Sequence, residues 1–415
     1  MSNVLQGDCV RVLVLNCGSS SVKFQLIETS PELAAAGGDC LLARGSVERI
    51  GEGEGRLTYE APGHPRTAAS AAGVDHEQAI RMALASLTDP PHGAIRRLEE
   101  IDAVGHRMVH GGESFRESVV IDEAVLTSIQ ECVPLAPLHN PHNLTGYFAS
   151  RRLLPHARHV AVFDTAFHQT LPPEAYTYGL PHGLAARYRL RRYGFHGTSH
   201  RYLMLRFAEL HRSPPEAFNL ITCHLGNGCS MCAIQRGRSV DCSLGFTPLE
   251  GLLMGTRTGD VDAAAILHLM AWEKFSLERM HTLLNLESGL YGISGISNDV
   301  RTLLEHARAG DQRARLALDV FCYRIRKYIG AYYAVLGGAD AVVFSAGIGE
   351  NAPTIRAAVC DPLEVFGIRL DPVKNAGAVG VEMDISADSA PVRAWVIPTN
   401  EEVLIARDTV RCLVG

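Results

Sequence analysis

Lysine is scarce in this chain. Only Lys23, Lys274, Lys327 and Lys374 occur among its 39 basic residues, and the others are arginines. Because arginine supplies most of the basic surface, each lysine is a candidate for a specific task. Positive charge is not in excess either, since 45 acidic residues give a formal net charge of −6. This balance excludes the electrostatic signature of a protein that binds nucleic acid or an anionic membrane.

Long apolar runs and targeting signals are also lacking. No uncharged apolar segment approaches the roughly 18 residues that a membrane span requires. Asp8 and Arg11 interrupt the start of the chain, where a signal peptide has its apolar core. The 11 cysteines are scattered, without the spacing of a disulfide framework. We therefore expect a cytoplasmic protein with reduced thiols and no membrane partner.

Several common site motifs are missing. No G-x-x-x-x-G-K-[ST] sequence occurs, which excludes a P-loop nucleotide site. The run Gly347-x-Gly-Glu-Asn351 lacks the third glycine of a Rossmann fingerprint. Cys229-x-x-Cys232 has no second pair to complete a zinc site. We interpret it as two small buried residues of a strand, and a metal-binding pair is the alternative.

What the chain does contain is the composition of a globular protein. Hydrophobic residues make up 47% and charged residues 20%, which excludes disordered and fibrous classes. The length of 415 residues predicts about two to three domains.

A pattern of strand, small-residue turn and strand occurs twice. The first hairpin covers Arg11–Glu28 with its turn at Cys17–Ser21, and the second covers Phe218–Ile234 with its turn at Gly226–Gly228. Apolar runs that lead into glycine and serine are typical of buried strands that enter tight turns. Two such hairpins, far apart in the chain, predict two similar halves.

Other segments indicate strands that alternate with helices. Three further strands end in polar or glycine-rich loops: His159–Phe163, Ala341–Phe344 and Trp395–Ile397. The second of these strands is followed by a loop over Ser345–Asn351, and apolar spacing predicts a helix over Asp311–Leu336. The stretch Gly51–Gly73, rich in glycine, proline and alanine, predicts a surface hairpin. This alternation favours an α/β fold with ligands at the carboxyl ends of strands.

Both hairpin turns are suited to phosphate, because small residues let backbone amides approach an anion closely. The first turn adds hydrogen-bonding oxygens from Asn16, Ser19, Ser20 and Ser21. Lys23 follows and can reach an anion as a point charge. An ordinary hairpin is the alternative for either turn taken alone.

Histidine and arginine gather in glycine-rich segments. The histidine clusters are Gly105–Glu113, Leu138–His142 and Gly194–His200, without an H-E-x-x-H motif. A zinc site is one interpretation, and contact with an anionic substrate is the favoured one. Arg107 and Arg257 lie near glycines, which leaves room for a guanidinium group to bind a carboxylate or phosphate. A structural arginine is the alternative for each.

Together these segments resemble the acetate kinase (acetokinase) family. Ten segments carry the resemblance, in the same order: Asn16–Lys23, Gly105–Glu113, Ala136–Leu144, Phe163–His168, Tyr193–His200, His224–Gly228, Phe246–Asp260, Ser288–Arg301, Gly347–Asn351 and Ile397–Glu402. The resemblance extends from about Val12 to Arg407.

The resemblance implies a two-domain α/β fold of the actin- and hexokinase-like (ribonuclease H-like) ATPases, with the active site in an interdomain cleft. Residues 1–165 with 402–415 are expected to form an N-terminal domain that holds the first turn and the acyl-substrate residues. Residues 166–401 are expected to form a C-terminal domain with the second turn and the nucleotide site. The family reaction is reversible, Mg²⁺-dependent transfer of the ATP γ-phosphoryl group to acetate, which gives acetyl phosphate and ADP. Mn²⁺ can substitute, and a homodimer is expected.

The resemblance also implies roles for individual residues. The expected catalytic residues are Asp164, His196 and Arg257. The expected acyl-substrate residues are Arg107, Val109, Leu138, Phe195 and Pro248. The expected metal ligands are Asn16 and Glu401. The expected ATP-binding residues are Lys23, His224, Leu225, Gly226, Asn227, Gly228, Asp299, Val300, Arg301, Gly347, Ile348, Gly349, Glu350 and Asn351.

Elementary chemistry refines these roles. Acetate needs no general base, because a carboxylic acid with a pKa of about 4–5 is already ionised at neutral pH. We therefore expect Asp164 to orient Mg²⁺ or an arginine, although the family role is acid/base catalysis. The branched side chain of Val109 leaves little room beyond a methyl group, which favours acetate over propionate. A propionate or butyrate kinase and a non-catalytic ATP-driven module remain as alternatives.

Overall fold

The computed structural model describes residues 9–137 and 139–414, which form two compact units. The first unit contains the chain up to Phe167 together with the segment from Asn400 onward, and the second contains His168–Thr399. The boundaries expected from the sequence are 165/166 and 401/402.

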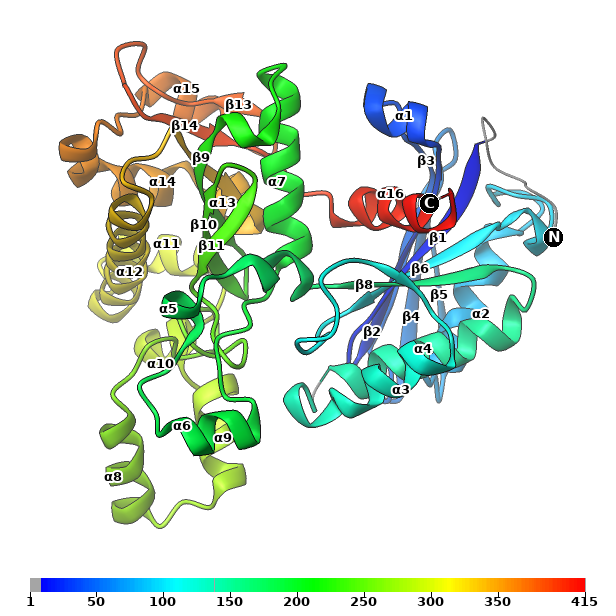
Figure 1. Cartoon of the computed structure of the whole chain (residues 1–415), viewed down its shortest axis with the longest axis horizontal. Helices are drawn as coiled ribbons and strands as arrows, with labels where there is room; N and C mark the ends of the chain where they lie inside the picture. Colours follow the sequence, from blue (N-terminus) through cyan, green and yellow to red (C-terminus); the bar gives the residue numbers. More distant parts are fainter. Residues whose placement is uncertain (1–8, 138, 415) are drawn as a thin grey trace. The chain divides into compact units, whose positions relative to one another are not determined.

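The first unit is built on an eight-stranded mixed sheet of order β5-β4-β3-β2-β1-β6-β8-β7 (Figure 1). Its strands are β1 (Val10–Cys17), β2 (Ser21–Thr29), β3 (Cys40–Glu48), β4 (Glu54–Glu60), β5 (Thr67–Ala72), β6 (Ala103–Met108), β7 (Val119–Val120) and β8 (Arg158–Phe163). Successive strands from β1 to β5 pair antiparallel, β1, β6 and β8 are parallel to one another, and β7 is antiparallel to β8.

Helices cover both faces of this sheet. They are α1 (Pro31–Ala36), α2 (His76–Leu87), α3 (Glu123–Glu131), α4 (Asn140–Leu153) and α16 (Glu401–Val414), with 3₁₀ turns η1 (Leu98–Glu100), η2 (Val133–Leu135) and η3 (Ala166–Thr170). The apolar strand β1 is buried on both faces, because successive side chains point to opposite sides. Leu13 and Leu15 pack in one cluster with Ile80 of α2, and Val12 packs in another with Ile405 of α16.

The second unit is built on a six-stranded sheet of order β11-β10-β9-β12-β14-β13. Its strands are β9 (Asn219–Leu225), β10 (Cys229–Gln235), β11 (Arg238–Cys242), β12 (Ala341–Ser345), β13 (Met383–Asp384) and β14 (Arg393–Val396). Its helices are α5 (Pro173–Tyr176), α6 (His182–Tyr188), α7 (Gly197–Leu210), α8 (Ala263–Glu273), α9 (Leu277–Leu286), α10 (Gly289–Ser294), α11 (Val300–Arg308), α12 (Gln312–Leu336), α13 (Ala346–Asn351), α14 (Pro353–Cys360) and α15 (Pro372–Gly377), with η4 (Pro215–Ala217) and η5 (Asp361–Phe366).

The two sheets share one plan. Three antiparallel strands, β3-β2-β1 or β11-β10-β9, are followed by two strands parallel to the last of them, β6-β8 or β12-β14. Each predicted turn joins the first two strands of its unit at the carboxyl end of the first strand. The expectation of two similar α/β domains is therefore confirmed.

Local expectations had mixed outcomes. Gly51–Gly73 contains the antiparallel pair β4 and β5, as expected for a hairpin. The loop expected over Ser345–Asn351 was wrong, because helix α13 begins at Ala346. Ala346 turns the chain with a left-handed φ of 61°, and Gly349 then packs closely on the sheet. A Cβ on Gly349 would lie 3.3 Å from the backbone carbon of Phe344.

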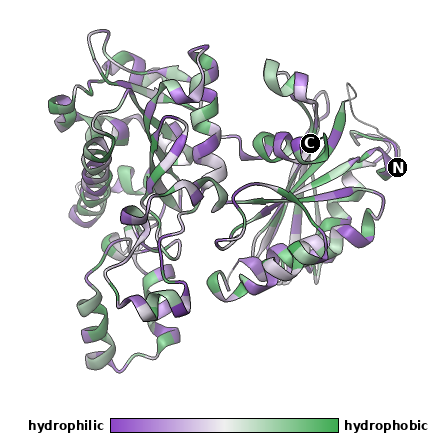
Figure 2. Ribbon diagram, in the orientation of Figure 1, coloured by the Kyte–Doolittle hydropathy of each residue, from purple (hydrophilic) through white to green (hydrophobic). Residues whose placement is uncertain are grey.

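Across residues 9–137 and 139–414, no helix combines the length and apolar character needed to cross a bilayer. The longest helix, α12, alternates between hydrophobic and hydrophilic residues along its length (Figure 2).

Candidate active site

Arg107 and Asp164 meet where two neighbouring strands of the first unit end. β6 and β8 are parallel with Arg107 opposite Val162, and Asp164 is the first residue after β8. The buried Asp164 carboxylate accepts hydrogen bonds from Arg107 Nε at 3.0 Å and from Nη2 at 2.5 Å. Such a bidentate contact fixes the plane of the guanidinium group. The opposite edge of the group remains directed at the first turn, where Nη1 donates to Asn16 Oδ1 at 3.3 Å.

Glu401, the first residue of α16, brings a second carboxylate to Arg107. Its Oε2 lies 3.8 Å from Arg107 Nε, and its side chain is 16% exposed. Burial raises the pKa of Glu401 to about 7, and the negative charges of Asp164 and Glu402 add to the shift. Burial opposes the charge of Arg107, but Asp164 and Glu401 raise its pKa. The negative charges of Asp164, Glu401 and Glu402 in this cluster therefore exceed the single positive charge of Arg107.

This cluster fits a magnesium ion. Asn16 and Glu401 offer oxygen donors, and Mg²⁺ is commonly held by one or two carboxylates together with substrate phosphates. The raised pKa of Glu401 is the shift that a nearby cation would reverse. The described part of the chain has no group of three or more histidine, cysteine, aspartate or glutamate side chains that could hold a metal ion.

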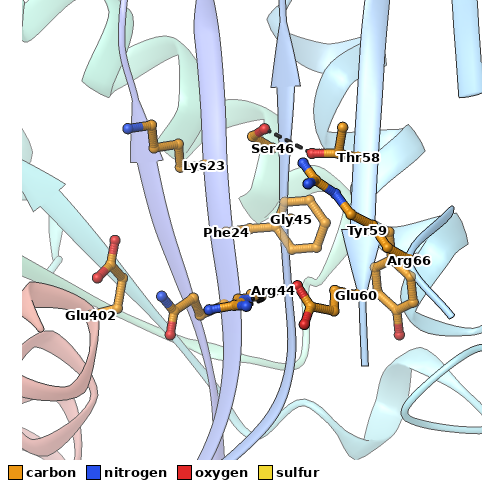
Figure 3. Close-up of a pocket in the computed structure, with 11 residues that line it drawn as sticks. Lys23, Phe24, Arg44, Gly45, Ser46, Thr58, Tyr59, Glu60, Arg66 and Glu402 are labelled. Carbon is orange, nitrogen blue, oxygen red and sulfur yellow. Dashed lines mark hydrogen bonds and ion pairs between the residues drawn. The ribbon is translucent and has the colours of Figure 1, made fainter. Parts of the chain in front are cut away.

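Lys23 lines a pocket of about 300 Å³ on the polar face of β2, β3 and β4 (Figure 3). It is the cross-strand partner of Asn16 on β1 and of Ser46 on β3. The other lining residues are Phe24, Gln25, Arg44, Gly45, Ser46, Thr58, Tyr59, Glu60, Arg66 and Glu402. The charge of Lys23 lowers the pKa of Glu401, against the larger effect of burial. Lys23 thus acts electrostatically on the same cluster as Arg107.

Asn143 of α4 connects the first turn to Val109, an expected acyl-substrate residue, and sequence reasoning did not select Asn143. Its Oδ1 accepts a hydrogen bond from Val109 N at 3.0 Å, and its Nδ2 donates to Cys17 O at 2.8 Å. Within the turn, Gly18 N donates to Ser21 O at 2.8 Å. The only sequence signal for Asn143 is its place in one of the ten segments of resemblance.

In the second unit, His196 and Arg257 converge on the second turn. A Cβ placed on Gly228 would lie 3.8 Å from His196 Nε2 and 3.7 Å from Arg257 Nη1. Burial lowers the pKa of Arg257, whose Nη1 donates to Pro248 O at 3.1 Å. Within residues 9–137 and 139–414 no carboxylate forms an ion pair with Arg257. A partly buried guanidinium group in this state favours an anionic ligand.

His196 itself is held in an unusual conformation. It precedes α7 with a left-handed φ of 56°, a strained conformation for a residue with a side chain and one that is typical of functional sites. Its Nδ1 lies 2.8 Å from Ser230 Oγ, and its ring centre lies 4.4 Å from that of His224. The Nδ1 of His224 in turn lies 2.8 Å from Ser199 Oγ. Neither serine was selected from the sequence, because each meets its histidine only through the packing of α7 on the sheet.

The expected nucleotide segments lie around the same turn. Ser345 is aligned with His224 in the parallel pair β9–β12, and a Cβ on Gly226 would lie 3.8 Å from Ala346 Cβ. Asn298 donates to Asn227 Oδ1 at 2.9 Å, which brings the start of α11 to the turn. The structure thus gathers these expected ATP residues in one unit: His224, Leu225, Gly226, Asn227, Gly228, Asp299, Val300, Arg301, Gly347, Ile348, Gly349, Glu350 and Asn351.

Arg356 of α14 stabilises α13, the helix that contains Gly347–Asn351, and sequence reasoning did not select it. Its side chain is fully buried, and its nitrogens donate to the carbonyl oxygens of Gly349, Glu350, Asn375 and Ala378 and to Asn375 Oδ1. Burial lowers its pKa to about 10. Five hydrogen bonds from one buried side chain join α13 to α14 and α15. Nothing in the sequence distinguishes this arginine from the many others.

The expected acyl-substrate residues are divided between the two units. Val109 is buried in the first unit, whereas Phe195 and Pro248 belong to the second, where Phe195 is 1% exposed and Pro248 is half-buried. Leu138 lies outside the described residues. The free cysteines Cys229 and Cys232 are both buried in β10, in agreement with the interpretation as strand residues.

Comparison with known proteins gives one consistent result. The model of the acetokinase family matches residues 11–407. The acetate kinase of Acetivibrio thermocellus is 51% identical over 402 residues, which cover 97% of this chain and 99% of that protein. The acetate kinase of Solibacter usitatus is 52% identical over 410 residues, which cover 98% and 99%.

Solved structures agree with this match. The crystal structure of Porphyromonas gingivalis acetate kinase superposes with a TM-score of 0.91 at 46% identity, over 97% of this chain and all of that one. A propionate kinase from Francisella tularensis superposes with a TM-score of 0.89 at 37% identity, over 97% and 99%.

Proposed function

Because this chain belongs to the acetokinase family, we propose that it transfers the γ-phosphoryl group of ATP reversibly to acetate, giving acetyl phosphate and ADP. One observation carries the proposal most directly. Asp164 fixes one guanidinium group, that of Arg107, in an orientation suited to a carboxylate. A second guanidinium group, that of Arg257, lies partly buried beside a glycine turn and has no carboxylate partner among the described residues. A reaction between a carboxylate and a phosphoryl group needs both.

Arg107 binds the acetate carboxylate in this proposal. Asp164 occupies its Nε–Nη2 edge, so the edge that carries Nη1, next to Asn16, is the one available to a substrate. Asp164 therefore acts by orienting Arg107. No residue is needed to remove a proton, because acetate is already ionised.

His196 and Arg257 act on the phosphoryl group. Phosphoryl transfer depends mainly on alignment and on stabilisation of charge that spreads over the equatorial oxygens. Both side chains point to Gly228, where the lack of a Cβ leaves space for phosphate oxygens. The segments that start α11 and form α13 bind the rest of the nucleotide.

Asn16 and Glu401 would hold Mg²⁺, or Mn²⁺ in its place. The bound ion supplies positive charge to the β- and γ-phosphate oxygens of ATP. Lys23 adds a second positive charge on the neighbouring strand.

Acetate is proposed as the preferred acid. The relatives of about 50% identity are named acetate kinases, and a buried Val109 limits the acyl group. The 37% identical structure is a propionate kinase, so the longer acid is the second candidate. Since one methylene group changes the free energy of binding by about 1–3 kcal/mol, propionate is expected as a poorer substrate.

The test is a coupled assay of ADP formation with ATP, Mg²⁺ and a panel of acetate, propionate and butyrate. We expect the highest kcat/KM with acetate and a loss of at least ~100-fold in Arg107→Ala. Arg81→Ala, which removes an exposed arginine of α2, is the matched control and keeps full activity. ATP hydrolysis that does not depend on any acid would instead support a non-catalytic ATP-driven module.

We further propose that the protein acts in the cytoplasm as a homodimer joined through its second unit. The helices α6, α8 and α9 lie at one end of this unit (Figure 1), and α8 is almost entirely hydrophobic (Figure 2). Helix α8 has no buried residue. The most exposed hydrophobic side chains here are Leu267, Trp272, Leu277 and Leu286, at 63–79%. An apolar surface of this kind is typical of an interface, and a second copy offers the same surface in return.

Sedimentation velocity tests the dimer. Trp272→Glu is expected to produce monomers with unchanged circular dichroism. Val373→Glu, at an equally exposed valine of α15, is the matched control and should leave the dimer intact. A wild-type protein that sediments as a monomer at micromolar concentration would contradict this part of the proposal.

A further inference from the structure

His196 is connected to the interior of its unit by a chain of short hydrogen bonds. Its Nδ1 lies 2.8 Å from Ser230 Oγ, and the same oxygen lies 2.8 Å from His200 Nε2. His200 Nδ1 lies 2.7 Å from Thr222 Oγ1. Ser230, His200 and Thr222 have no exposed surface, so solvent does not compete for these contacts.

His200 is a neutral imidazole. Burial lowers its pKa well below the ordinary value, and the nearby rings of His168 and His224 add to the shift. A neutral imidazole carries one N–H donor and one acceptor nitrogen. Ser230 offers a single hydroxyl hydrogen, so it donates to one of its two histidine partners and accepts from the other.

Two directions of donation satisfy these rules. In the first, Thr222 donates to His200, His200 Nε2–H donates to Ser230, and Ser230 donates to His196 Nδ1. In the second, every bond is reversed, and the Thr222 hydroxyl must then donate elsewhere. Among the residues that the structure describes, the other acceptor for the Thr222 hydroxyl is Cys232 O at 3.5 Å, which is too long for a strong bond. A buried donor without a good acceptor is costly, so the first direction is favoured.

We propose that Thr222, His200 and Ser230 are positioning residues that hold His196 neutral, with its hydrogen on Nε2. This inference rests on the proposed role of His196 at the phosphoryl group. The Nε2–H then points to the space above Gly228 that Arg257 Nη1 also faces. His196 acts as a neutral hydrogen-bond donor to a phosphoryl oxygen, and Arg257 supplies the positive charge.

His196 is linked to His200 of α7 through Ser230, and it lies beside His224 of β9 and Arg257 from the loop after β11. Its left-handed backbone conformation also directs the ring, so both the position and the tautomer are set before substrate binds.

The decisive measurement is the ¹⁵N spectrum of the histidine rings in full-length protein labelled at histidine. The signal of His196 is assigned by its loss in His196→Gln. We expect an unprotonated Nδ1 and a protonated Nε2 from about pH 6 to about pH 8. A doubly protonated ring at neutral pH, or a hydrogen on Nδ1, would overturn the proposal. This spectrum needs no activity, so it is informative even if the proposed function fails.

Kinetics tests the same chain of residues independently. Ser230→Ala removes the donor to Nδ1 and is expected to lower kcat about 10- to 100-fold, with mixed tautomers in the spectrum. Ser243→Ala is the matched control, because its buried hydroxyl accepts a hydrogen bond from Met231 N. The Ser243→Ala variant also loses one buried hydrogen bond next to the same sheet, but its kcat and the ¹⁵N signals of His196 should not change. An unchanged kcat and spectrum in Ser230→Ala would overturn the inference, whereas activity retained in His196→Gln would count against the proposed function.

Discussion

The carboxylate of Asp164 holds the Nε–Nη2 edge of Arg107, with contacts of 3.0 Å and 2.5 Å. Both residues are at the ends of neighbouring parallel strands, so their distance is set by the sheet. The pair fixes the guanidinium group of Arg107 in one orientation, which the proposed binding of a small carboxylate requires.

Asp164→Asn is therefore expected to raise the KM for acetate and to lower kcat/KM about 100-fold. The asparagine amide loses the charge and presents only one acceptor to two donors. The KM for ATP should change little, and extra Mg²⁺ should not restore activity. Steady-state kinetics with each substrate varied in turn provides the measurement.

A double-mutant cycle decides whether Asp164 acts through Arg107. If it does, Arg107→Ala with Asp164→Asn is no worse than Arg107→Ala alone, because the effects of residues in direct contact are not additive. Losses that multiply would contradict the orienting role and favour direct action of Asp164 on the reaction.

Val109 is expected to set the acyl size. Val109→Ala removes two methyl groups at a buried position, which makes room for one more methylene group in the substrate. The ratio of kcat/KM for propionate to that for acetate should rise about 10-fold. Val104→Ala removes the same groups from β6 on the core side and should leave the ratio unchanged. An unchanged ratio in Val109→Ala would place the limit on acyl size elsewhere.

The part of the fold that could be predicted is local. The two hairpins were found because an apolar run followed by glycine and serine is a signal within about ten residues. Helix α13 was missed because Gly347 and Gly349 argue for a loop, whereas packing of Gly349 on the sheet stabilises a helix.

The support of the site could not be predicted, because it depends on strand register and helix packing. Ser230 lies opposite His224 in the sheet and meets His196 and His200 from α7. No spacing in the sequence encodes these contacts. Arg356 could not be predicted for a different reason. In a chain with many arginines, each arginine is expected to lie on the surface, whereas Arg356 is fully buried.

Arg356→Leu is expected to lower the free energy of unfolding by about 3 kcal/mol or more, because it leaves buried carbonyl oxygens without donors. The KM for ATP should rise more than the KM for acetate, since Gly349 and Glu350 belong to the proposed nucleotide segment. Urea unfolding and steady-state kinetics measure both effects. Arg326→Leu is the matched control: from a partly exposed position on α12, this arginine donates to Ala358 O of α14, the helix that carries Arg356. Equal losses in the two variants would contradict a special role for Arg356.

Acid is expected to destabilise the protein through its buried histidines. Burial lowers the pKa of His110 and of His159 to about 4, and it lowers the pKa of His106 and His200 well below the ordinary value. Each ring is neutral in the folded protein and titrates near pH 6.5 in the unfolded chain. The unfolded chain therefore binds more protons below about pH 6.5, and stability that is complete above this pH is lost as the pH falls toward 4.

Each such histidine should lower the free energy of unfolding by about 1.4 kcal/mol per pH unit below about pH 6. Urea unfolding between about pH 7.5 and about pH 5 measures this slope, above the range in which most carboxylates titrate. His159→Asn should reduce the slope by about one proton, whereas replacement of the exposed His182 should leave it unchanged. A slope near zero in the wild type would mean that the buried rings accept protons in the folded state, which would contradict the neutral His200 on which the orientation of His196 depends.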